Sequence, residues 1–435
     1  MEEQGTQRRC IVVLVPCPFQ GHITPMLQLG TVLHSMGFSI IIAHTKFNSP
    51  NPSDGLTQSD CPSGDVFAFL STLNTNCKGR LRACLEQLME QQEVDCIIYD
   101  TLMYISEAVA NHLNLPSIVL RTMGASSLMA YKAIPRLQAE GCVPPQDFIL
   151  QALVPELEPL RFKDLPISKF NSLESLLQMC AIACNIKTSV AIIWNTIDYL
   201  EHSSLVQLHQ HYKVPSFSIG HKFASVSPSS LLKEDTDCIT WLDKQAPNSV
   251  IYVSLGSLAS MDEKELAETA WGLANSDQPF LWVIRPASVA GSEWVELLPE
   301  GFKEAIGEKG LIVKWAPQKD VLAHGAVGGF LSHCGWNSTL ESISEGVPMI
   351  CWPSFGDQMV NARYVSHVWR VGLELENELE RREIERAVRS LMVDKEGEEI
   401  RQRVIDLKEK IALCMRDGGS SCNSLNDLKE YILSL

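Results

Sequence analysis

The sequence predicts an α/β protein with two doubly wound domains, each a parallel sheet flanked by helices. Short β-branched segments alternate with amphipathic segments along most of the chain, which is the pattern of strands joined by crossover helices. The alternation is interrupted once, by a stretch with little hydrophobic periodicity. The 435 residues suffice for two domains of ordinary size, each with its own core.

The predicted strands fall into two series, one in each half of the chain. The first series comprises residues 11–15, 38–43, 96–99, 117–120 and 190–194, and the second comprises residues 250–254, 280–284, 311–314, 329–332 and 349–352. Helical stretches between them include residues 25–35, 79–89, 262–275 and 382–393. The polar, turn-rich residues 51–65 are predicted to form a loop. We expect an N-terminal domain at 1–215, a linker at 216–237, a second domain at 238–410 and, at 411–435, a C-terminal helix that packs back toward the N-terminal domain.

The composition excludes several classes of protein. The net charge of −16 would repel a phosphate backbone, so we expect no nucleic-acid partner. No apolar run reaches the length of a membrane span. The 14 cysteines are scattered and include no C-x-x-C pair, which indicates reduced core residues rather than a disulfide framework. We expect a cytoplasmic monomer.

The clearest sign of a ligand site is a strand that runs directly into a helix. The strand is GGFLSH, at 328–333, and Asn337 is predicted as the N-cap of the helix. Free N–H groups and the helix dipole favour a phosphate at such a position. His333 and Ser338 add side-chain donors, and Glu341 lies one turn further on, within reach of ribose hydroxyls. Taken alone, the stretch also fits a plain helix cap with His333 as a satisfied polar residue.

Three other segments strengthen the ligand interpretation. GSLAS, at 256–260, offers a second turn rich in N–H groups after a strand. Trp315 follows a strand, where it either packs in the core or stacks on a base. Asp357 and Gln358 begin a helix after another strand and are suited to hold sugar hydroxyls. Together these segments offer contacts for a base, a ribose, a diphosphate and a sugar.

The segment 315–358, WAPQKDVLAHGAVGGFLSHCGWNSTLESISEGVPMICWPSFGDQ, resembles without gaps the donor-binding box of plant UDP-glycosyltransferases of glycosyltransferase family 1. FQGHITPM, VSLGS and the ends of the chain resemble this family too. LRFKDLP, at 160–166, is similar to the subgroup that includes steviol, cytokinin and benzoxazinoid glucosyltransferases. The resemblance implies the GT-B fold, with two Rossmann-like domains facing a cleft that holds the ligand, and inverting transfer from a UDP-sugar.

The resemblance implies a donor contact for the matching residues. It implies that uracil stacks on Trp315 beside the Ala316 backbone, that Gln318 and Glu341 hold the ribose, that Ser257, His333, Asn337 and Ser338 hold the diphosphate, and that Trp336, Asp357 and Gln358 face the sugar. In this family, Gln at the end of the box accompanies glucose and His accompanies galactose. Trp at position 336 accompanies glucose where Arg marks glucuronate. Both positions therefore imply UDP-glucose as the co-substrate.

Inverting transfer needs a general base, and His22 in PFQGHITPM is the candidate. Thr24 is predicted as an N-cap and Pro25 as the first helical residue, which would place His22 just outside the positive end of a helix and keep it neutral. Asp100 ends a strand of the same sheet and could hold the Nδ1 proton of His22. Each residue alone also fits a bystander or a helix cap, but the catalytic pair of the family matches both positions.

The remaining expectations concern the acceptor and the cofactors. We expect no metal ion and no cofactor besides the co-substrate, because the helix dipole and polar donors offset the pyrophosphate charge. The acceptor pocket is expected to be apolar with a few polar anchors, formed by N-terminal loops that include Phe19, Thr122 and Met123. Such a pocket suits a small lipophilic plant metabolite with a hydroxyl or carboxyl group.

A rival interpretation is a non-catalytic or impaired UDP-sugar-binding protein. The segment between the strand at 38–43 and the helix at 79–89 is shorter than in the family, and this region helps to form the wall of the acceptor pocket. The presence of both His22 and Asp100 favours an enzyme instead. A dehydrogenase would require G-x-G-x-x-G after the first strand, and an α/β-hydrolase would require G-x-S-x-G; the sequence contains neither.

Overall fold

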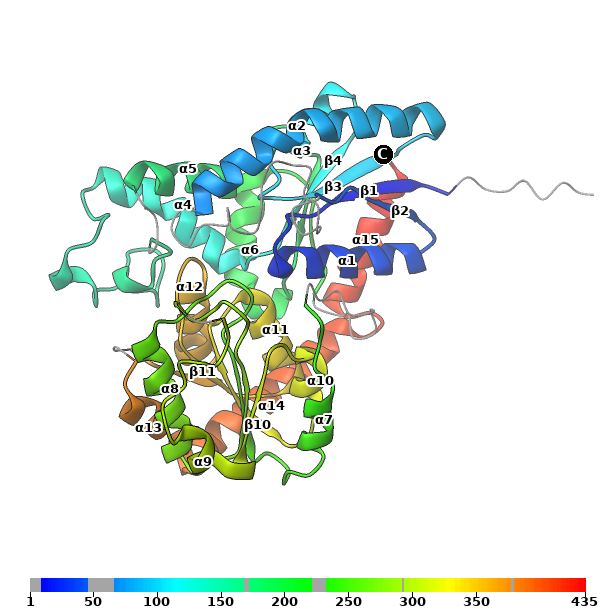
Figure 1. The fold of residues 1–435 in the computed structure, drawn as a ribbon. Coiled ribbons are helices and arrows are strands. Elements are labelled where there is room, and N and C mark those ends of the chain that lie inside the picture. Colours follow the sequence, from blue (N-terminus) through cyan, green and yellow to red (C-terminus); the bar gives the residue numbers. More distant parts are fainter. Residues whose placement is uncertain (1–8, 46–65, 168–171, 221–231, 292, 377–378) are drawn as a thin grey trace, which may run out of the picture. The chain divides into compact units, whose positions relative to one another are not determined.

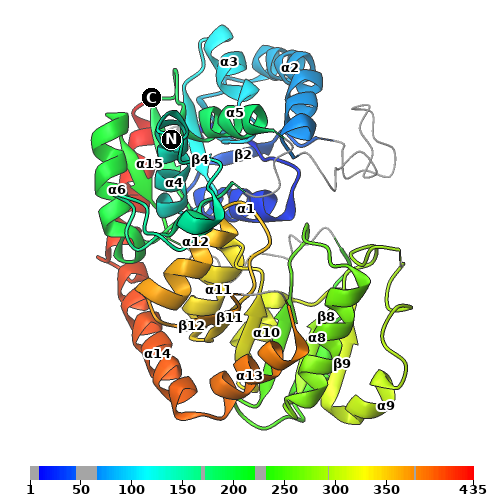
Figure 2. The ribbon, with the colours of Figure 1, turned by 90° about the vertical axis from the view of Figure 1, so that its left-hand side faces the viewer.

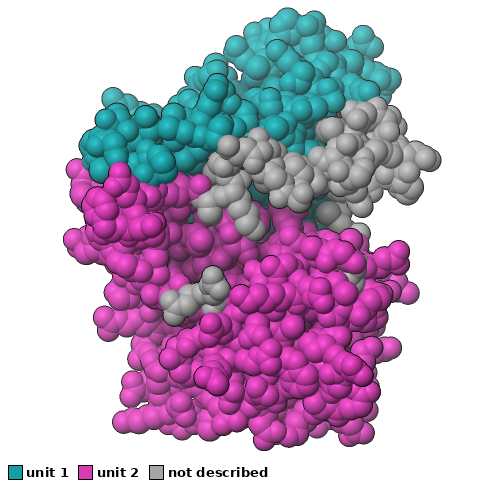
Figure 3. Space-filling view, turned by 60° about the vertical axis from the view of Figure 1, so that its left-hand side comes forward, with its two compact units in different colours: residues 1–144, 169–229, 414–435 teal, residues 145–168, 230–413 magenta. Residues whose placement is uncertain are grey.

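The computed structural model describes residues 9–45, 66–167, 172–220, 232–291, 293–376 and 379–435. The chain divides into two compact units (Figure 3): unit 1 comprises residues 1–144, 169–229 and 414–435, and unit 2 comprises residues 145–168 and 230–413. The predicted loop at 51–65 and residues 221–231 of the predicted linker lie outside the described residues. The domain boundaries expected from the sequence stay a prediction.

Unit 1 contains a six-stranded parallel sheet with strand order β2-β1-β3-β4-β5-β6 (Figure 1). Its strands are β1 (Ile11–Val15), β2 (Ser39–Ile42), β3 (Cys96–Asp100), β4 (Ser117–Arg121), β5 (Ala191–Trp194) and β6 (Ser216–Ser218). Its helices are α1 (Gln20–Ser35), α2 (Val66–Gln91), α3 (Ile105–His112), α4 (Ala125–Ala139), α5 (Leu173–Cys184), α6 (Asp198–Tyr212) and α15 (Ser420–Leu433). The strand order reverses between β1 and β3, which is where doubly wound sheets bind ligands.

One face of this sheet is covered by the first and the last helix of the chain. Leu29 of α1 and Leu428 of α15 are fully buried in one cluster with Leu14 and Ile98 of the sheet. The Tyr431 hydroxyl also donates a hydrogen bond to the Val190 carbonyl, at 2.9 Å. Figure 1 shows α2 and α3 on the opposite face. Helices on both faces explain why β3, β4 and β5 are buried along their whole length rather than at alternate residues.

Unit 2 contains a second six-stranded parallel sheet, with strand order β12-β11-β10-β7-β8-β9 (Figure 2). Its strands are β7 (Val250–Ser254), β8 (Phe280–Val283), β9 (Gly310–Val313), β10 (Val327–Ser332), β11 (Met349–Cys351) and β12 (Gly372–Glu374). The helices that follow the linker are α7 (Asp237–Leu242), α8 (Glu263–Asn275), α9 (Phe302–Ile306), α10 (Gln318–Ala323), α11 (Trp336–Glu345), α12 (Gln358–Arg363), α13 (Arg381–Met392) and α14 (Lys395–Met415). Leu266 of α8 and Ile384 of α13 share a core with Val253 of the sheet.

The predicted fold class is confirmed, but several elements differ from the sequence prediction. The strands β6 and β12 were not expected, because each has three residues and shows no pattern of its own. β6 lies where the sequence places the start of the linker, and it forms by pairing with β5 at the sheet edge. Helix α2 begins well before the predicted 79–89, because the buried Phe69, Leu70 and Leu73 extend its apolar stripe. No helix in the described ranges is long and apolar enough to cross a membrane.

Candidate active site

At the carboxyl edge of the unit 1 sheet, the structure brings together His22, Asp100 and Thr122. Asp100 is the last residue of β3, His22 lies on the helix that follows β1, and Thr122 follows β4. His22 Nδ1 lies 2.8 Å from Asp100 Oδ2 and 2.9 Å from Thr122 Oγ1. The Asp100 side chain is buried, whereas that of His22 is 22% exposed. The two residues predicted as a pair are therefore in hydrogen-bond contact.

The start of α1 differs from the sequence prediction. We expected Thr24 as the N-cap and His22 outside the helix, but α1 begins at Gln20 and its N-cap is Phe19. The Phe19 carbonyl accepts a hydrogen bond from the His22 N–H at 2.9 Å, so the first turn forms earlier. Pro25 lies inside α1, in its second turn, where its missing N–H removes one intrahelical hydrogen bond. His22 thus lies within the first turn, still at the positive end of the dipole.

The contacts of His22 define which ring nitrogen can accept a proton. An unprotonated Nδ1 at 2.8 Å from the Asp100 carboxylate would bring two lone pairs together, so the proton must be on Nδ1. The carboxylate is itself fixed, because Asp100 Oδ1 accepts a hydrogen bond from the Leu102 N–H at 2.8 Å. In a neutral imidazole one nitrogen donates and the other accepts. Nε2 of His22 therefore carries the lone pair.

The three residues predicted to contact the acceptor all follow strand ends of unit 1. Phe19 is buried, with its ring 5.6 Å from that of Phe69 and 6.1 Å from that of His22. Thr122 is buried against the His22 ring, and Met123 is half-buried. Their contact with an acceptor stays a prediction.

In unit 2, the turn after β10 runs directly into α11, but the N-cap is Gly335 rather than Asn337. Gly335 has the extended dihedrals φ −58° and ψ 142°, and its carbonyl accepts a hydrogen bond from the Thr339 N–H at 2.9 Å. Trp336 and Asn337 are therefore the first two helical residues. The first N–H groups of any helix have no intrahelical acceptor, so this turn is suited to bind an anion.

His333 packs against two glycines on neighbouring turns. A Cβ atom at either Gly256 or Gly335 would lie 2.5 Å from the His333 ring, so both positions require glycine. Gly256 also has φ +73°, which disfavours any L side chain. Burial lowers the pKa of His333 to about 4. A hydrogen bond with the Ser254 backbone opposes this shift. The ring is therefore neutral near neutral pH, with one N–H donor, and its contact with a diphosphate stays a prediction.

Gln318 connects two other residues predicted to bind the donor. Its Nε2 donates to Ser338 Oγ at 3.0 Å and to Glu341 Oε2 at 2.7 Å. Burial raises the pKa of Glu341, while the hydrogen bond from Gln318 and the nearby Lys319 charge oppose this shift. The two residues expected to share the ribose are thus in direct contact.

Asp357 and Gln358 lie at the start of α12, as predicted, with Asp357 as the N-cap residue. Gln358 Oε1 accepts hydrogen bonds from the N–H groups of Ser354, at 2.9 Å, and Phe355, at 3.2 Å. The side-chain oxygen of Gln358 therefore stabilises the loop before α12. The side-chain nitrogen of Gln358 is the group suited to bind a sugar hydroxyl.

The other predicted donor residues lie at the carboxyl edge of the unit 2 sheet. Trp315 is half-buried and Ala316 is buried, and both follow β9. Ser257 is half-buried and follows β7. The strands are parallel, so the turns after β7, β9, β10 and β11 all stand at this one edge.

The sequence analysis missed Asn361 and Trp369. Asn361 Nδ2 donates to the carbonyl of Cys334 at 3.0 Å and so supports that residue at its left-handed φ of +62°. Trp369 lies with its ring centroid 6.4 Å from that of Trp336. Asn361 follows Asp357 by one helical turn, which is a signal that could have identified it; Trp369 carries no comparable signal.

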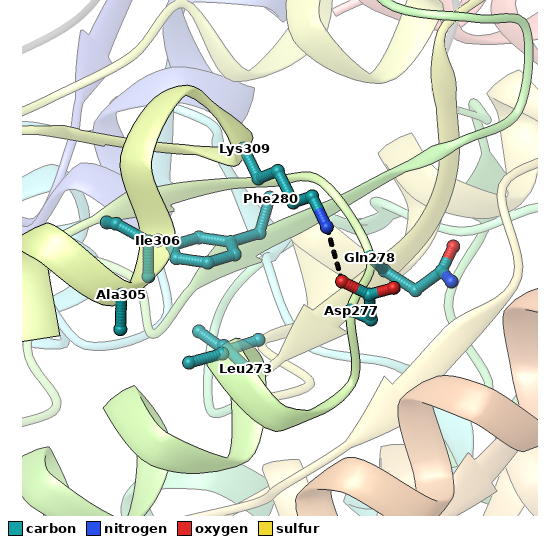
Figure 4. Close-up of a pocket in the computed structure, with 8 residues that line it drawn as sticks. Leu273, Asp277, Gln278, Phe280, Ala305, Ile306 and Lys309 are labelled. Atoms are coloured by element: carbon teal, nitrogen blue, oxygen red, sulfur yellow. Dashed lines mark hydrogen bonds and ion pairs between the residues drawn. The ribbon is translucent and has the colours of Figure 1, made fainter.

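A pocket of about 40 Å³ lies at the opposite, amino edge of the unit 2 sheet (Figure 4). Phe280, at the start of β8, lines it together with Asp277 and Lys309, which form an ion pair. It is too small for a nucleotide sugar, and none of the predicted site residues lines it. Within the described residues, no group of three or more His, Cys, Asp or Glu side chains is arranged to hold a metal ion.

Comparisons with known proteins identify the family. A family model described as "UDP-glucoronosyl and UDP-glucosyl transferase" matches residues 231–407. UDP-glycosyltransferase 76E1 of Solanum lycopersicum is 53% identical, over 99% of this chain and 94% of that protein. Flavonol 3-O-glucosyltransferase UGT76E12 of Arabidopsis thaliana is 48% identical, over 100% of this chain and 99% of that protein.

A solved structure shares the fold. The structure of Phytolacca americana UGT2, complexed with UDP-2fluoro-glucose and pterostilbene, matches with a TM-score of 0.82 and 28% identity. The match covers 98% of this chain and 99% of that chain. The chain therefore belongs to the plant UDP-glycosyltransferase family, with the GT-B fold of that family, and is a UDP-dependent glucosyltransferase.

Proposed function

We propose that this enzyme transfers glucose, with inversion at the anomeric carbon, from UDP-glucose to a hydroxyl or carboxyl group of a small lipophilic plant metabolite. The contact between His22 Nδ1 and the buried Asp100 carries the proposal, because it leaves Nε2 as a proton acceptor. The flavonol and the pterostilbene named for two relatives support a planar, lipophilic acceptor.

His22 acts as the general base in this mechanism. The acceptor oxygen forms a bond to the anomeric carbon as the bond from that carbon to the UDP oxygen breaks, and the acceptor proton moves to His22 Nε2. Asp100 stabilises the resulting imidazolium through the Nδ1–H bond. General bases contribute about 10²–10⁴ in rate. A carboxylate acceptor is already ionised and needs no such help.

Unit 2 binds the donor and stabilises the leaving group. The β-phosphate of UDP gains negative charge as the bond breaks, and the N–H groups at the start of α11 offset that charge together with His333. Because these donors carry the diphosphate charge, no metal ion is required. The remaining donor contacts are the uracil on Trp315 and the Ala316 backbone, the ribose on Gln318 and Glu341, the diphosphate on Ser257, Asn337 and Ser338, and the glucose on Trp336, Asp357 and Gln358.

The test is a transfer assay with the full chain. The enzyme is incubated with UDP-glucose and a panel of flavonols and stilbenes, and both UDP release and glucoside mass are measured. We expect a β-glucoside from the α-linked donor, which proton coupling at the anomeric carbon identifies by NMR. An α-glucoside would contradict inversion. UDP-glucose binding without transfer to any acceptor would support the alternative, a non-catalytic UDP-sugar-binding protein.

The roles of Trp336 and Gln358 predict the choice of sugar. UDP-glucose, UDP-galactose and UDP-glucuronate compete at equal concentration, and we expect the glucoside to dominate the products. The single variants Trp336→Arg and Gln358→His should each reduce the preference for UDP-glucose. The first removes the indole and the second removes the amide that is proposed to contact the glucose hydroxyls. A dominant galactoside or glucuronide from the unsubstituted enzyme would contradict both roles.

We further propose that the enzyme works in the cytosol as a monomer. The cysteines in the described residues are all free thiols, including the exposed Cys84, and a reducing compartment keeps thiols in this state. Light scattering at micromolar concentration tests the oligomeric state, and a dimer would contradict this proposal.

A further inference from the structure

Thr122 stands on a short turn that a buried carboxylate holds in place. Glu201 Oε2 accepts a hydrogen bond from the Ala125 N–H at 2.8 Å, and Glu201 Oε1 accepts one from the Ser126 N–H at 2.8 Å. The Thr196 hydroxyl donates to Glu201 Oε2 at 2.6 Å. Glu201 is 3% exposed. It therefore caps the first turn of α4 and fixes the backbone just after Thr122.

The backbone of Glu201 departs from the helix to make this cap. It lies inside α6 with the non-helical dihedrals φ −132° and ψ 26°. The kink in α6 brings the Glu201 carboxylate to the start of α4. Without it, two backbone N–H groups of α4 would lose a charged acceptor. A buried glutamate and a bent helix thus support one turn of the chain, the turn that carries Thr122.

The side chain of Thr122 is buried against His22, the candidate base, rather than exposed to solvent. Thr122 is 7% exposed, and its Oγ1 lies 2.9 Å from His22 Nδ1. Asp100 Oδ2 lies 2.8 Å from the same nitrogen. Since Nδ1 carries the proton, two oxygens accept from one N–H, which is a three-centre hydrogen bond. Two acceptors, one at the end of β3 and one just after β4, restrain the ring plane more tightly than one.

We propose that Thr122 is a positioning residue for the reaction: its hydroxyl shares the Nδ1–H of His22 with Asp100 and so fixes the direction of the Nε2 lone pair. The inference rests on the proposed function of His22 as the base. It gives Thr122 a role different from the acceptor contact that the sequence suggests. An acceptor contact would change KM for the acceptor, whereas positioning of the base changes kcat.

The experiment compares isosteric and conservative variants with a flavonol as the acceptor. Thr122→Val keeps the β-branched shape but lacks the oxygen, and we expect kcat to fall about tenfold while KM for both substrates stays within about twofold. Thr122→Ser restores the oxygen and should bring kcat to within about threefold of the unsubstituted enzyme. Thr122→Ala, which also lacks the oxygen, repeats the test if the valine variant is unstable.

Thr101→Val is the matched control. Thr101 is also buried, and its hydroxyl donates to the Leu120 carbonyl at 3.2 Å rather than meeting His22, so we expect kcat close to that of the unsubstituted enzyme. An equal loss in Thr101→Val, an unchanged kcat in Thr122→Val, or no recovery in Thr122→Ser would overturn the inference. If His22→Ala loses turnover and Thr122→Val does not, the inference alone fails. If the unsubstituted enzyme transfers no glucose, the proposed function fails as well.

Discussion

The two candidate sites of this enzyme are built in different ways. In unit 1, the proposed base is a single side chain, His22, oriented by Asp100 and Thr122. In unit 2, the start of α11 offers backbone N–H groups, and the side chains of His333 and Ser338 are proposed to add to them. A substitution in unit 1 removes the reacting group itself, whereas a substitution in unit 2 leaves the backbone donors in place. Unit 1 should therefore be the more sensitive site.

The two histidines also differ in their surroundings. His22 is partly exposed and lies against a buried carboxylate, which stabilises its protonated form. His333 packs against glycines, and burial lowers its pKa to about 4. The first histidine is thus suited to receive a proton and the second to remain a neutral donor. We therefore propose two roles for one residue type, because the neighbours of the two histidines differ.

The largest expected effect is that of His22→Ala. Turnover of a flavonol should fall by about 10²–10⁴, because the general base is lost, while the Kd for UDP measured by calorimetry should not change. His34→Ala is the matched control, since His34 is an exposed histidine in the last turn of the same helix. Near-normal turnover in His22→Ala, or an equal loss in His34→Ala, would be incompatible with the assignment.

The sequence predicted which residues lie together at these sites better than it predicted their local geometry. His22 and Asp100 were identified because polar residues after buried strands are easily recognised, and β3 ends at Asp100 as expected. The start of α1 was misplaced because Pro25 is the stronger signal, although Phe19 is the N-cap. The three-centre contact of Thr122 depends on strand order and side-chain rotamer, which no local pattern encodes.

In unit 2, too, the local geometry was predicted less well than the set of residues. The turn into α11 was predicted from its sequence, yet the N-cap is Gly335, and Asn337 is already the second helical residue. The contact of Gln318 with Glu341 joins residues 23 positions apart, on different helices. Only the tertiary structure brings such pairs together. The resemblance to a family could therefore suggest that Gln318 and Glu341 both bind the ribose, but not that they contact each other.

The second largest effect is expected for His333→Ala. Its N–H should bind more strongly as the leaving UDP gains charge, so turnover should fall by about 10–10³ and donor affinity should fall less. Ser338→Ala should cost less, because the backbone N–H groups remain. Steady-state kinetics at saturating acceptor measures both. A loss in Ser338→Ala larger than that in His333→Ala would show that side-chain hydroxyls dominate the phosphate contacts.

A smaller effect of a different kind is expected for Glu341→Ala. Its carboxylate is proposed to touch the ribose, far from the bond that breaks, so KM for UDP-glucose should rise about tenfold with kcat nearly unchanged. Varying UDP-glucose at saturating acceptor separates the two constants. If Glu341→Ala lowered only kcat while His333→Ala weakened only donor binding, the roles given to the two residues would have to be exchanged.

The smallest effect concerns stability and pH. The pKa of His333 is about 4 in the folded enzyme, below its ordinary value of 6.5, so the unfolded chain binds a proton first as the pH falls. The stability contributed by the neutral ring is complete above pH 6.5 and is lost progressively toward pH 4. Tm of the unsubstituted enzyme should therefore fall more steeply than Tm of His333→Asn between about pH 7 and pH 5. Parallel slopes would contradict this account.

The central claim is that His22 accepts the acceptor proton, and a series of acceptors of increasing acidity tests it most directly. Rates of the unsubstituted enzyme and of His22→Ala are compared for an aliphatic alcohol, a flavonol and 4-nitrophenol at saturating UDP-glucose. We predict that the rate ratio is largest for the alcohol and smallest for 4-nitrophenol, because an acidic hydroxyl needs little help to lose its proton. A ratio that stays constant across the series would contradict the claim.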